Sequence, residues 1–390
     1  MNDATGTGAD QLVIAVEAPP AVLDDDTVGW ALDRLRSSGR NLGATLVTGS
    51  RDRSVGPALL VEIFSMPSSD SSTADPESYR FTVDESAEPP RVTIQARDRR
   101  GAVYAVTELA ERIDAGRSFD GLAPDGPELH TPATPLRSVC RSFSYVHDDL
   151  PWFRSRSFWP EYLDHLAEQR FNRFHLALGM QYNYGFGATG PQTASDNYLC
   201  FAYPFLVEVP GFGVRVQGVS DEERDRNLAA LRYIARETRR RGMDFQLGLW
   251  NHAYDYGKGS EHWYPILGIG RESHATYSAA GAAALLEAVP DITGLTFRVH
   301  YEGGISDSHV AFWDTMFGAI SEVGRPIDID LHAKGVDRGI VEAADKPNLR
   351  VVLSPKFAAE HMGLPYHQAS IRPFEAPRPV REGYELMGTA

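Results

Sequence analysis

A glutamate directly after an apolar segment is the leading candidate for chemistry in this chain. Glu302 follows LTFRVHY, and the two glycines behind it allow the backbone to turn sharply. The neighbouring Arg298, His300 and Tyr301 could move the pKa of its carboxyl group in either direction. A carboxylic acid in this position could protonate a leaving oxygen, as glycoside hydrolysis requires, or it could only hydrogen-bond a sugar hydroxyl at the surface.

Glycoside hydrolysis needs a second carboxylate, which acts as a base or as a nucleophile. Glu360 is the obvious candidate because it lies in SPKFAAEHMGLPYHQ, a stretch dense in polar residues that includes Lys356. Glu360 could equally cap a helix there. Asp148, Asp149 and Asp255 compete for the same role because each follows a predicted strand.

Aromatic and polar residues gather after several other predicted strands. Aromatic faces stack on sugar rings and polar groups hold the hydroxyls, although aromatic-rich loops also serve merely to cover a barrel mouth. Asp328 and Asp330 alternate within one predicted strand and should share a face. We predict no metal ligands and no cofactor. The predicted substrate-binding set is Trp250, Asn251, His252, Asp255, Arg298, His300, Tyr301, His332, Lys334, Lys356, Tyr182, His147 and Asp148.

The elements that must position these residues alternate between strands and helices. Six segments between Arg137 and Pro355 read as buried strands, and helical patterns separate them. This alternation predicts parallel strands with right-handed crossovers. A doubly wound sheet would usually carry a glycine-rich loop after its first strand, whereas this chain has Tyr145, His147 and Asp148 there. The predicted fold is therefore α/β, a (β/α)8-type barrel with about six visible strands, in which strand ends converge on one face.

We expect three parts along the chain. Residues 1–120 read as a non-catalytic α/β module, residues 121–135 as a linker rich in Pro and Gly, and residues 136–390 as the catalytic barrel-like domain. The later strands of the module alternate polar with apolar residues, which predicts an antiparallel sheet with one solvated face. No seventh or eighth barrel strand is visible after Pro355, which favours a fragment of a longer protein over a barrel closed in another way.

Composition limits the partners of the protein. A net charge of −15 over 390 residues argues against nucleic acid and anionic membranes as partners. Neither a secretory signal nor a run of about 20 apolar residues is present, so we expect a cytoplasmic location. Cys140 and Cys200 form no metal-binding pattern, and we expect Cys140 in the core. The expected partner is a small molecule derived from an oligo- or polysaccharide. The sequence leaves open whether the protein forms a homo-oligomer.

Three stretches carry a resemblance to known enzymes. DRRGAVYAVTELAERI, followed by a proline-rich joint, LRSVCRSF and EYLDHLAEQRFNRFHLALG, is similar to the α-glucuronidase and β-hexosaminidase group of glycoside hydrolases. That group places a comparable module before a (β/α)8 catalytic barrel, and the likeness spans most of residues 11–300. The hexosaminidase pattern has an adjacent Asp-Glu pair after strand four, whereas this chain has Tyr301 and Glu302 there.

The glucuronidase branch implies an acid after strand four, which Glu302 matches, and further carboxylates on later strands, for which Glu360 is a loose fit. An anionic sugar such as a uronic acid would suit the basic residues of the set, namely Arg298, His332, Lys334 and Lys356. The leading hypothesis is therefore a glycosidase that cleaves a terminal sugar, with an acidic sugar among the candidates.

Two other functions fit the same sequence. A metal-dependent sugar isomerase or epimerase would use Glu302, His252, Asp255 and His332 as ligands. A non-catalytic partial barrel would bind carbohydrate without cleaving it.

Overall fold

The computed structural model describes residues 12–49, 58–66, 75–123, 129–179, 197–254, 263–300, 303–305 and 309–354. Contacts divide the chain into two compact units. Unit 1 contains residues 1–137, 161–172 and 238–243, and unit 2 contains residues 138–160, 173–237 and 244–390. Among the described helices, none combines the length and the hydropathy that a membrane-spanning segment requires.

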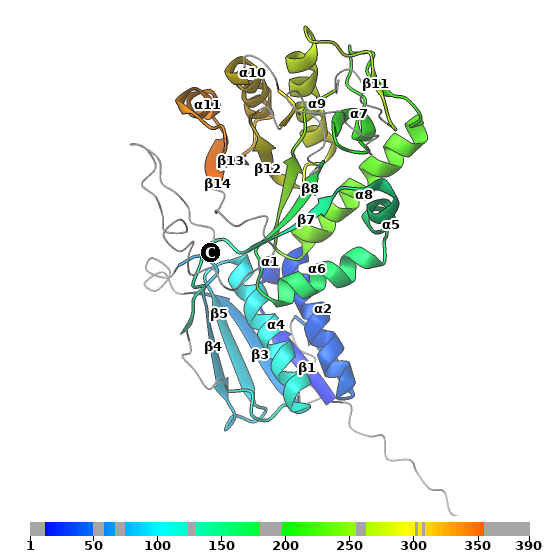
Figure 1. Ribbon diagram of the computed structural model, residues 1–390. Coiled ribbons are helices and arrows are strands. Elements are labelled where there is room, and N and C mark those ends of the chain that lie inside the picture. Colours follow the sequence, from blue (N-terminus) through cyan, green and yellow to red (C-terminus); the bar gives the residue numbers. More distant parts are fainter. Residues whose placement is uncertain are drawn as a thin grey trace, which may run out of the picture. The chain divides into compact units, whose positions relative to one another are not determined.

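Unit 1 is built on a six-stranded mixed sheet with the order β2-β1-β3-β5-β4-β6 (Figure 1). Its helices α2 and α4 pack against each other and against the sheet. The main elements are β1 (Leu12–Glu17), α1 (Pro20–Leu23), α2 (Asp26–Asn41), β2 (Ala44–Thr48), β3 (Leu59–Ser65), β4 (Tyr79–Asp84), β5 (Arg91–Ala96), α4 (Arg99–Gly116) and β6 (Leu129–His130).

Two aspartates start the long helices of unit 1. The Asp25 carboxylate accepts hydrogen bonds from the backbone N–H groups of Thr27 (2.9 Å) and Val28 (3.2 Å) at the start of α2. The Asp98 carboxylate accepts from Gly101 N–H (3.0 Å) at the start of α4. Each carboxylate thereby satisfies backbone groups that have no partner within the helix.

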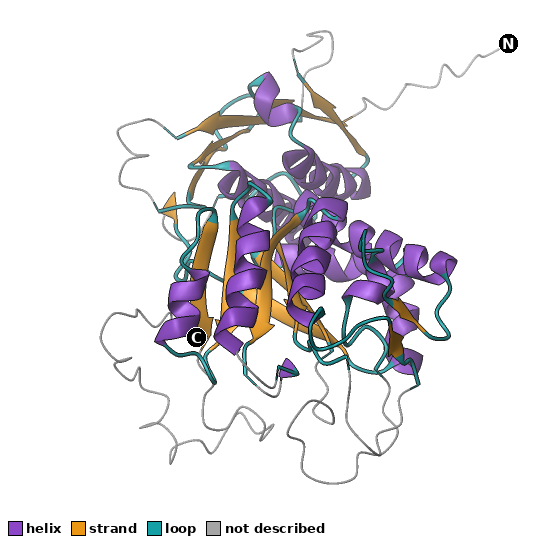
Figure 2. Cartoon of the chain, turned by 90° about the horizontal axis from the view of Figure 1, so that it is seen from above, coloured by secondary structure: helices purple, strands orange, loops and turns teal. Residues whose placement is uncertain are grey.

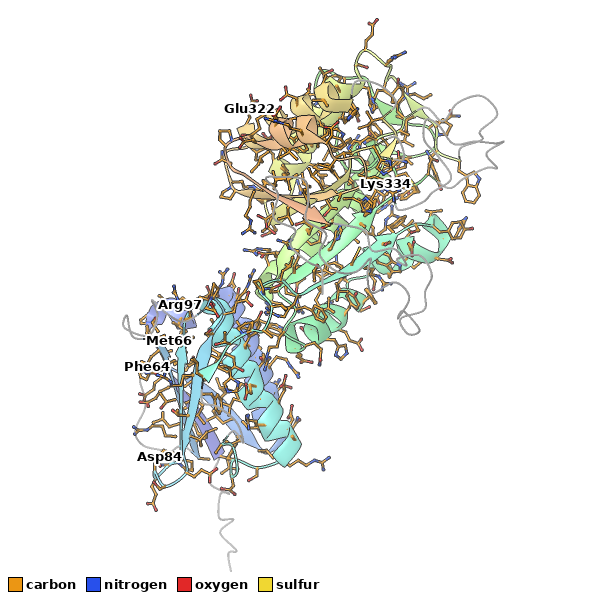
Figure 3. The ribbon with its side chains drawn as sticks, turned by 60° about the vertical axis from the view of Figure 1, so that its left-hand side comes forward. Phe64, Met66, Asp84, Arg97, Glu322 and Lys334 are labelled. Atoms are coloured by element: carbon orange, nitrogen blue, oxygen red, sulfur yellow. The ribbon has the colours of Figure 1, made fainter. Side chains whose placement is uncertain are left out.

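The expected antiparallel pairing is confirmed for only part of this sheet. The pairs β1–β3 and β3–β5 are parallel, whereas β4 pairs antiparallel with both β5 and β6. The polar–apolar alternation reflects one buried and one open face, which a sheet of either direction can have. The predicted linker also contains strand β6, where His130 lies opposite Tyr79 and stacks on its ring at 4.7 Å. Figure 3 shows Phe64, Met66 and Arg97 towards one end of this sheet and Asp84 at the other.

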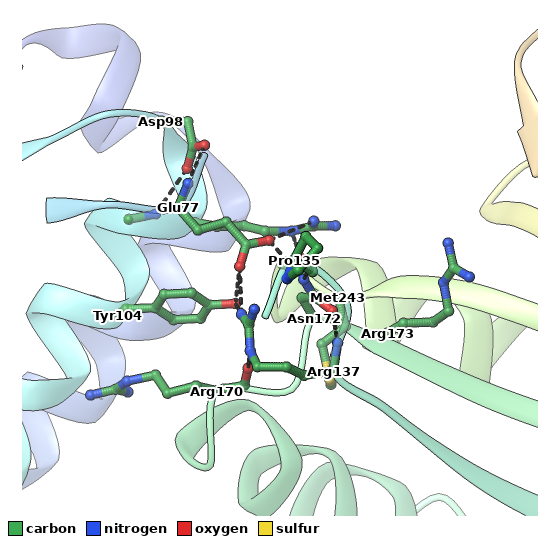
Figure 4. A network of polar contacts seen from close by, with 12 residues as sticks. Glu77, Asp98, Tyr104, Pro135, Arg137, Arg170, Asn172, Arg173 and Met243 are labelled. Atoms are coloured by element: carbon green, nitrogen blue, oxygen red, sulfur yellow. Dashed lines mark hydrogen bonds and ion pairs between the residues drawn. The ribbon is translucent and has the colours of Figure 1, made fainter. Parts of the chain in front are cut away.

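A buried carboxylate organises one side of unit 1 (Figure 4). Glu77 is 5% exposed, and its Oε1 accepts hydrogen bonds from Arg100 Nη1 (3.0 Å) and Asn172 Nδ2 (2.9 Å). Its Oε2 accepts from Arg137 Nη2 and Tyr104 OH. Burial alone would raise the pKa of Glu77, but the hydrogen bonds and charges of these partners outweigh it and lower the pKa. The carboxylate therefore stays ionised, and it holds residues that come directly before β7 and β8.

Unit 2 is built on a six-stranded parallel sheet with the order β14-β13-β12-β10-β8-β7. Its strands are β7 (Ser138–Phe143), β8 (Arg173–Leu178), β10 (Asp244–Leu249), β12 (Ile292–Arg298), β13 (Ile327–His332) and β14 (Leu349–Ser354). A small antiparallel pair is formed by β9 (Arg215–Val216) and β11 (Ile266–Leu267). The helices of unit 2 are α5 (Val146–Arg154), α7 (Tyr203–Leu206), α8 (Asp221–Arg240), α9 (His274–Ala288), α10 (His309–Glu322) and α11 (Arg338–Ala344), although the last three residues of α8 belong to unit 1. Helix α6 (Phe158–Glu168) has its first three residues in unit 2 and the rest in unit 1.

The strand order of this sheet follows the order of the strands in the sequence. A doubly wound sheet would reverse direction at one point, whereas here each strand pairs with the preceding strand of the same sheet. Helices lie along the strands, as Figure 2 shows. The fold is therefore mixed α/β with a partial, barrel-like parallel sheet and a small N-terminal module, and the six predicted strands are all present.

Candidate functional site

The two faces of the parallel sheet differ sharply in chemistry. On β8, Phe174 contacts Trp159 of α6 at 5.6 Å between ring centroids, and on β12 Phe297 contacts Trp313 of α10 at 5.0 Å. These strand positions therefore face the helices and form the apolar core. Because side chains alternate along a strand, the residues between them point to the opposite face.

That opposite face is lined by polar side chains at every level of the sheet. The strand register places Gln246 beside His175, Thr296 beside Asp330, and Arg298 beside His332. Ser354, the last residue of β14, lies beside His332. We call this surface the polar face, and its residues are Arg173, His175, Gln246, Trp250, Thr296, Arg298, Asp328, Asp330, His332, Arg350 and Ser354.

The lower end of the polar face, near the strand starts, is closed by an ion-pair group. Asp328 accepts a hydrogen bond from Arg173 Nη2 at 2.6 Å and from Arg350 Nε at 2.9 Å. The carboxylate is mostly buried and Arg173 is 7% exposed, so both charges are compensated within the group. This arrangement ties β8, β13 and β14 together across the face.

A chain of hydrogen bonds crosses the middle of the face. Gln246 Nε2 donates to Thr296 Oγ1 at 3.1 Å, and Thr296 Oγ1 donates to Asp330 Oδ2 at 3.2 Å. Ser354 Oγ donates to Asp330 Oδ1 at 2.5 Å. Burial raises the pKa of Asp330, although these hydroxyl groups oppose the shift. As predicted, Asp328 and Asp330 share a face, but only Asp330 lies without a hydrogen-bonded arginine.

Basic and aromatic groups gather at the upper end of the face, where the strands end. The guanidinium carbon of Arg298 lies 4.8 Å from the ring centroid of Trp250, close enough for a cation–π contact. The Trp250 ring contacts His332 at 5.6 Å, and His332 contacts His300 at 6.5 Å. Residues that follow or end three different strands are thereby brought together, as the sequence predicted for Trp250, Arg298, His300 and His332.

Two ring nitrogens converge above Gly248. A Cβ atom at Gly248 would lie 2.7 Å from His175 Nε2 and 2.9 Å from Trp250 Nε1. Both nitrogens are buried, and neither has a hydrogen-bond partner in the described part of the chain. Burial, with a smaller contribution from Arg173, lowers the pKa of His175 to about 4, so the imidazole is neutral at pH 7. The Gln246 Oε1 atom on the same face is also buried without a described hydrogen-bond partner.

His252 does not lie on the polar face, which corrects the prediction that it holds substrate hydroxyls. It is 0% exposed, its Nε2 hydrogen-bonds Tyr203 OH at 2.9 Å, and its ring contacts Phe297 and Trp313 on the helix side. Burial and then His274 lower its pKa to about 3. The residue is a neutral part of the apolar core.

Asn251 is also buried in the structure rather than open to a ligand. It is 2% exposed, and its Oδ1 accepts from Ala253 N–H at 2.6 Å, which shapes the turn after β10. Its Nδ2 has no hydrogen-bond partner among the described residues. Substrate binding by Asn251 stays a prediction.

The remaining predicted residues fall into two groups. His147 and Asp148 are exposed in the first turn of α5, where His147 contacts the rings of Tyr145 and Trp263. Lys334 follows β13 and is labelled in Figure 3. The other predicted residues lie outside the described part of the chain, namely Glu302, Glu360, Asp255, Tyr301, Lys356 and Tyr182.

The two glycines that follow the leading candidate lie in the described part of the chain. The Gly303 N–H donates to the His300 carbonyl at 2.7 Å, and Gly304 has a φ of 83°. A Cβ atom at Gly304 would lie 2.2 Å from Ala253 N, so the close approach also requires glycine.

Sequence reasoning missed His175, Gln246, Thr296 and Ser354, which lie within strands rather than after them. The available signal was the alternation inside RFHLAL and DFQLGL, where a polar residue interrupts apolar ones with a period of two. Cys140, expected in the core, is exposed instead, because it alternates onto the polar side opposite His175.

The fold is shared with glycoside hydrolases of known structure. A GH138 enzyme targeting pectin rhamnogalacturonan II matches with a TM-score of 0.59 and 17% identity. The match covers 87% of this chain and 38% of that chain. CpGH84D matches with a TM-score of 0.50 and 9% identity, over 88% of this chain and 52% of that one. This chain thus spans about half or less of the length of either structure.

At these identities the likeness shows the fold alone. The sequence matches no protein-family model and no curated protein.

Proposed function

We propose that this chain binds a terminal sugar on the polar face and contributes to its hydrolysis, with Glu302 as the general acid. Glu302 follows β12 closely in the sequence, and β12 contributes Thr296 and Arg298 to the polar face. In barrel-like α/β folds the residues after the strands form the active face.

The observation that carries the proposal is the set of unpaired polar atoms on this face. His175 Nε2, Gln246 Oε1 and Trp250 Nε1 are buried without partners among the residues that the structure describes, although buried polar groups in proteins are nearly always paired. The indole N–H can only donate, and the amide oxygen can only accept. A sugar suits such a face because each hydroxyl group both donates and accepts.

Preference for an acidic sugar is the finer part of the proposal. Arg298 is 4% exposed and lies beside His332, so a buried positive charge is present where the strands end. A guanidinium group can bind a carboxylate with two parallel hydrogen bonds. Lys334 and Lys356 would add to the positive potential.

Glu360 is the proposed second carboxylate, and Asp330 is an alternative. Asp330 is the described carboxylate of the polar face that has no hydrogen-bonded arginine, and burial raises its pKa. A carboxyl group with a raised pKa keeps its proton to a higher pH than an ordinary carboxyl group does, which suits an acid or base in the reaction.

The geometry favours this function over a metal-dependent isomerase. The proposed ligands His252 and His332 point to opposite sides of the sheet, because His252 packs against Phe297 and Trp313 while His332 contacts Trp250. These two imidazoles therefore do not meet at one ion.

The test is hydrolysis of a panel of p-nitrophenyl glycosides and uronides by the wild type and by Glu302→Gln. Loss of a general acid lowers the turnover rate by about 10²- to 10⁴-fold while sugar binding persists. Glu322→Gln, an exposed change on α10, is the matched control and keeps the wild-type rate.

Sugar binding without hydrolysis by the wild type would contradict the glycosidase proposal and favour a non-catalytic carbohydrate-binding protein. Equal rates for Glu302→Gln and the wild type would remove Glu302 from the reaction.

A further inference from the structure

Trp250 differs from the other tryptophans that are buried or half-buried. In Trp30, Trp152, Trp159 and Trp313 the indole Nε1–H donates to a protein oxygen at 2.9 to 3.1 Å; these acceptors are Asp164 Oδ1, Asp149 Oδ1, Phe153 O and Val299 O. The Nε1 atom of Trp250 is also buried, yet it has no acceptor among the described residues. An unpaired buried donor costs roughly 1 to 3 kcal/mol, so its retention requires a reason.

The second unpaired nitrogen lies close to the first. His175 Nε2 and Trp250 Nε1 are both within 2.9 Å of the point that a Gly248 Cβ would occupy. A single oxygen atom slightly further from the backbone could therefore hydrogen-bond both. We call this place the Gly248 notch.

The residue at position 248 controls access to both nitrogens. Any side chain there would occupy the space between them, and its Cβ would also lie 3.0 Å from the Cα of Ala177 on β8. Glycine is thus needed at position 248 because any Cβ atom would fill this space. The backbone conformation at this position does not itself require glycine.

We propose that the Gly248 notch binds one hydroxyl group of the sugar and thereby fixes the orientation of the sugar ring on the polar face. This inference rests on the proposed saccharide function and adds His175 and Trp250 as residues that determine specificity.

A hydroxyl group fits the notch better than a carboxylate does. The Trp250 indole only donates, so the ligand atom must accept. The neutral His175 ring carries its proton on either nitrogen, so Nε2 is a donor in one tautomer and an acceptor in the other. A hydroxyl oxygen can accept from Trp250 and either accept from or donate to His175, whereas a carboxylate fits one tautomer only.

The experiment follows the indole N–H signals in NMR spectra of protein with isotope-labelled tryptophan. The chain has six tryptophans, and Trp250→Phe identifies the Trp250 signal by its loss. The probes are D-glucuronate, D-galacturonate, D-glucose and N-acetyl-D-glucosamine, and calorimetry measures the affinity for each. We expect at least one of these sugars to bind and to shift the Trp250 signal.

Variants separate the notch from general packing. Trp250→Phe and His175→Phe should each weaken binding of that sugar about tenfold, as expected for the loss of one buried hydrogen bond. His175→Gln places an amide nitrogen near the position of Nε2 and should restore most of the affinity. Trp30→Phe removes an indole N–H that is already paired in unit 1 and should bind the sugar like the wild type.

The outcomes are distinct. If a sugar binds while the Trp250 signal stays in place and the Phe variants keep wild-type affinity, the notch is refuted and the saccharide function stands. If a sugar binds through the notch but no glycoside is cleaved, the notch stands and the hydrolase proposal fails. If no probe binds the folded wild type, both fail.

Discussion

Removal of the Glu77 charge should destabilise unit 1 strongly. Glu77→Gln keeps the shape of the side chain, but it replaces one accepting oxygen with an NH2 group that faces a donor. Arg100 and Arg137 then lose the carboxylate to which they donate. The other partners, Asn172 and Tyr104, are neutral and contribute less.

The size of the effect follows from these contacts. Each hydrogen bond to the charged carboxylate is worth about 1.5 to 3 kcal/mol, and breaking a buried ion pair from one side costs about 3 to 5 kcal/mol. Arg100 also donates to the Gly242 carbonyl and Arg137 to the Arg170 carbonyl, so each guanidinium group keeps a hydrogen-bond acceptor in the variant. We therefore expect the free energy of unfolding to fall by about 3 kcal/mol, the lower end of the range for a broken buried ion pair. This corresponds to a melting temperature lower by roughly 6 to 12 °C.

The pH dependence gives a second readout. The pKa of Glu77 is lower in the folded protein than its ordinary value of 4.5. The stabilisation is therefore complete above that value, and it is lost as the pH falls through the folded pKa. The difference in stability between wild type and Glu77→Gln should accordingly shrink in acid.

The assay is thermal unfolding followed by circular dichroism and by the Trp30 indole signal, because Trp30 is buried in unit 1. Glu85→Gln, an exposed change in the turn after β4, is the matched control and should shift the melting temperature little. A variant Glu77→Gln that melts with the wild type at neutral pH would refute the idea that this carboxylate stabilises the unit.

Three further changes test other parts of the structure. His252→Ala leaves Tyr203 OH without its hydrogen-bond partner His252 and opens a cavity, so the free energy of unfolding measured with urea should fall by about 3 kcal/mol. The folded variant should keep the sugar affinity of the wild type in calorimetry. Asp330→Asn removes a carboxyl group whose pKa is raised on folding, so that ionisation destabilises the folded wild type. The variant should therefore gain stability relative to the wild type as the pH rises above 3.8. A stability difference that stays constant across a pH series of urea denaturations would contradict this. Gly304→Ala places a side chain at a φ of 83° against Ala253 N and should lower the free energy of unfolding by at least about 2 kcal/mol. Its control is Gly318→Ala on α10, where nothing lies within 4 Å of the added Cβ, and this change should be neutral or stabilising in the same urea denaturation.

The sequence predicts unit 2 well because its elements are defined by local patterns. Each strand is a short apolar run, and the helices have apolar residues at helical spacing, as in Val310, Trp313 and Phe317. Local patterns do not determine which strands pair or in which direction they run. The parallel pairing of β3 with β5 depends on long-range packing, and the same alternating residues would suit an antiparallel neighbour.

The site was predicted in part for a similar reason. Trp250, Arg298 and His332 could be expected together because they lie at the ends of parallel strands. His252 has the same sequence context two positions after Trp250, but the chain turns at Asn251, so its ring faces the aromatic core instead. The convergence of His175 and Trp250 above Gly248 depends on the register between β8 and β10, which no single segment encodes.

The strand orders of the two sheets imply different assembly histories during synthesis. In unit 2 every strand pairs with one that has already left the ribosome, so the sheet can grow by addition at one edge. In unit 1, β5 lies between β3 and β4, both of which are made earlier, so β4 has to wait for β5 before it can join that sheet.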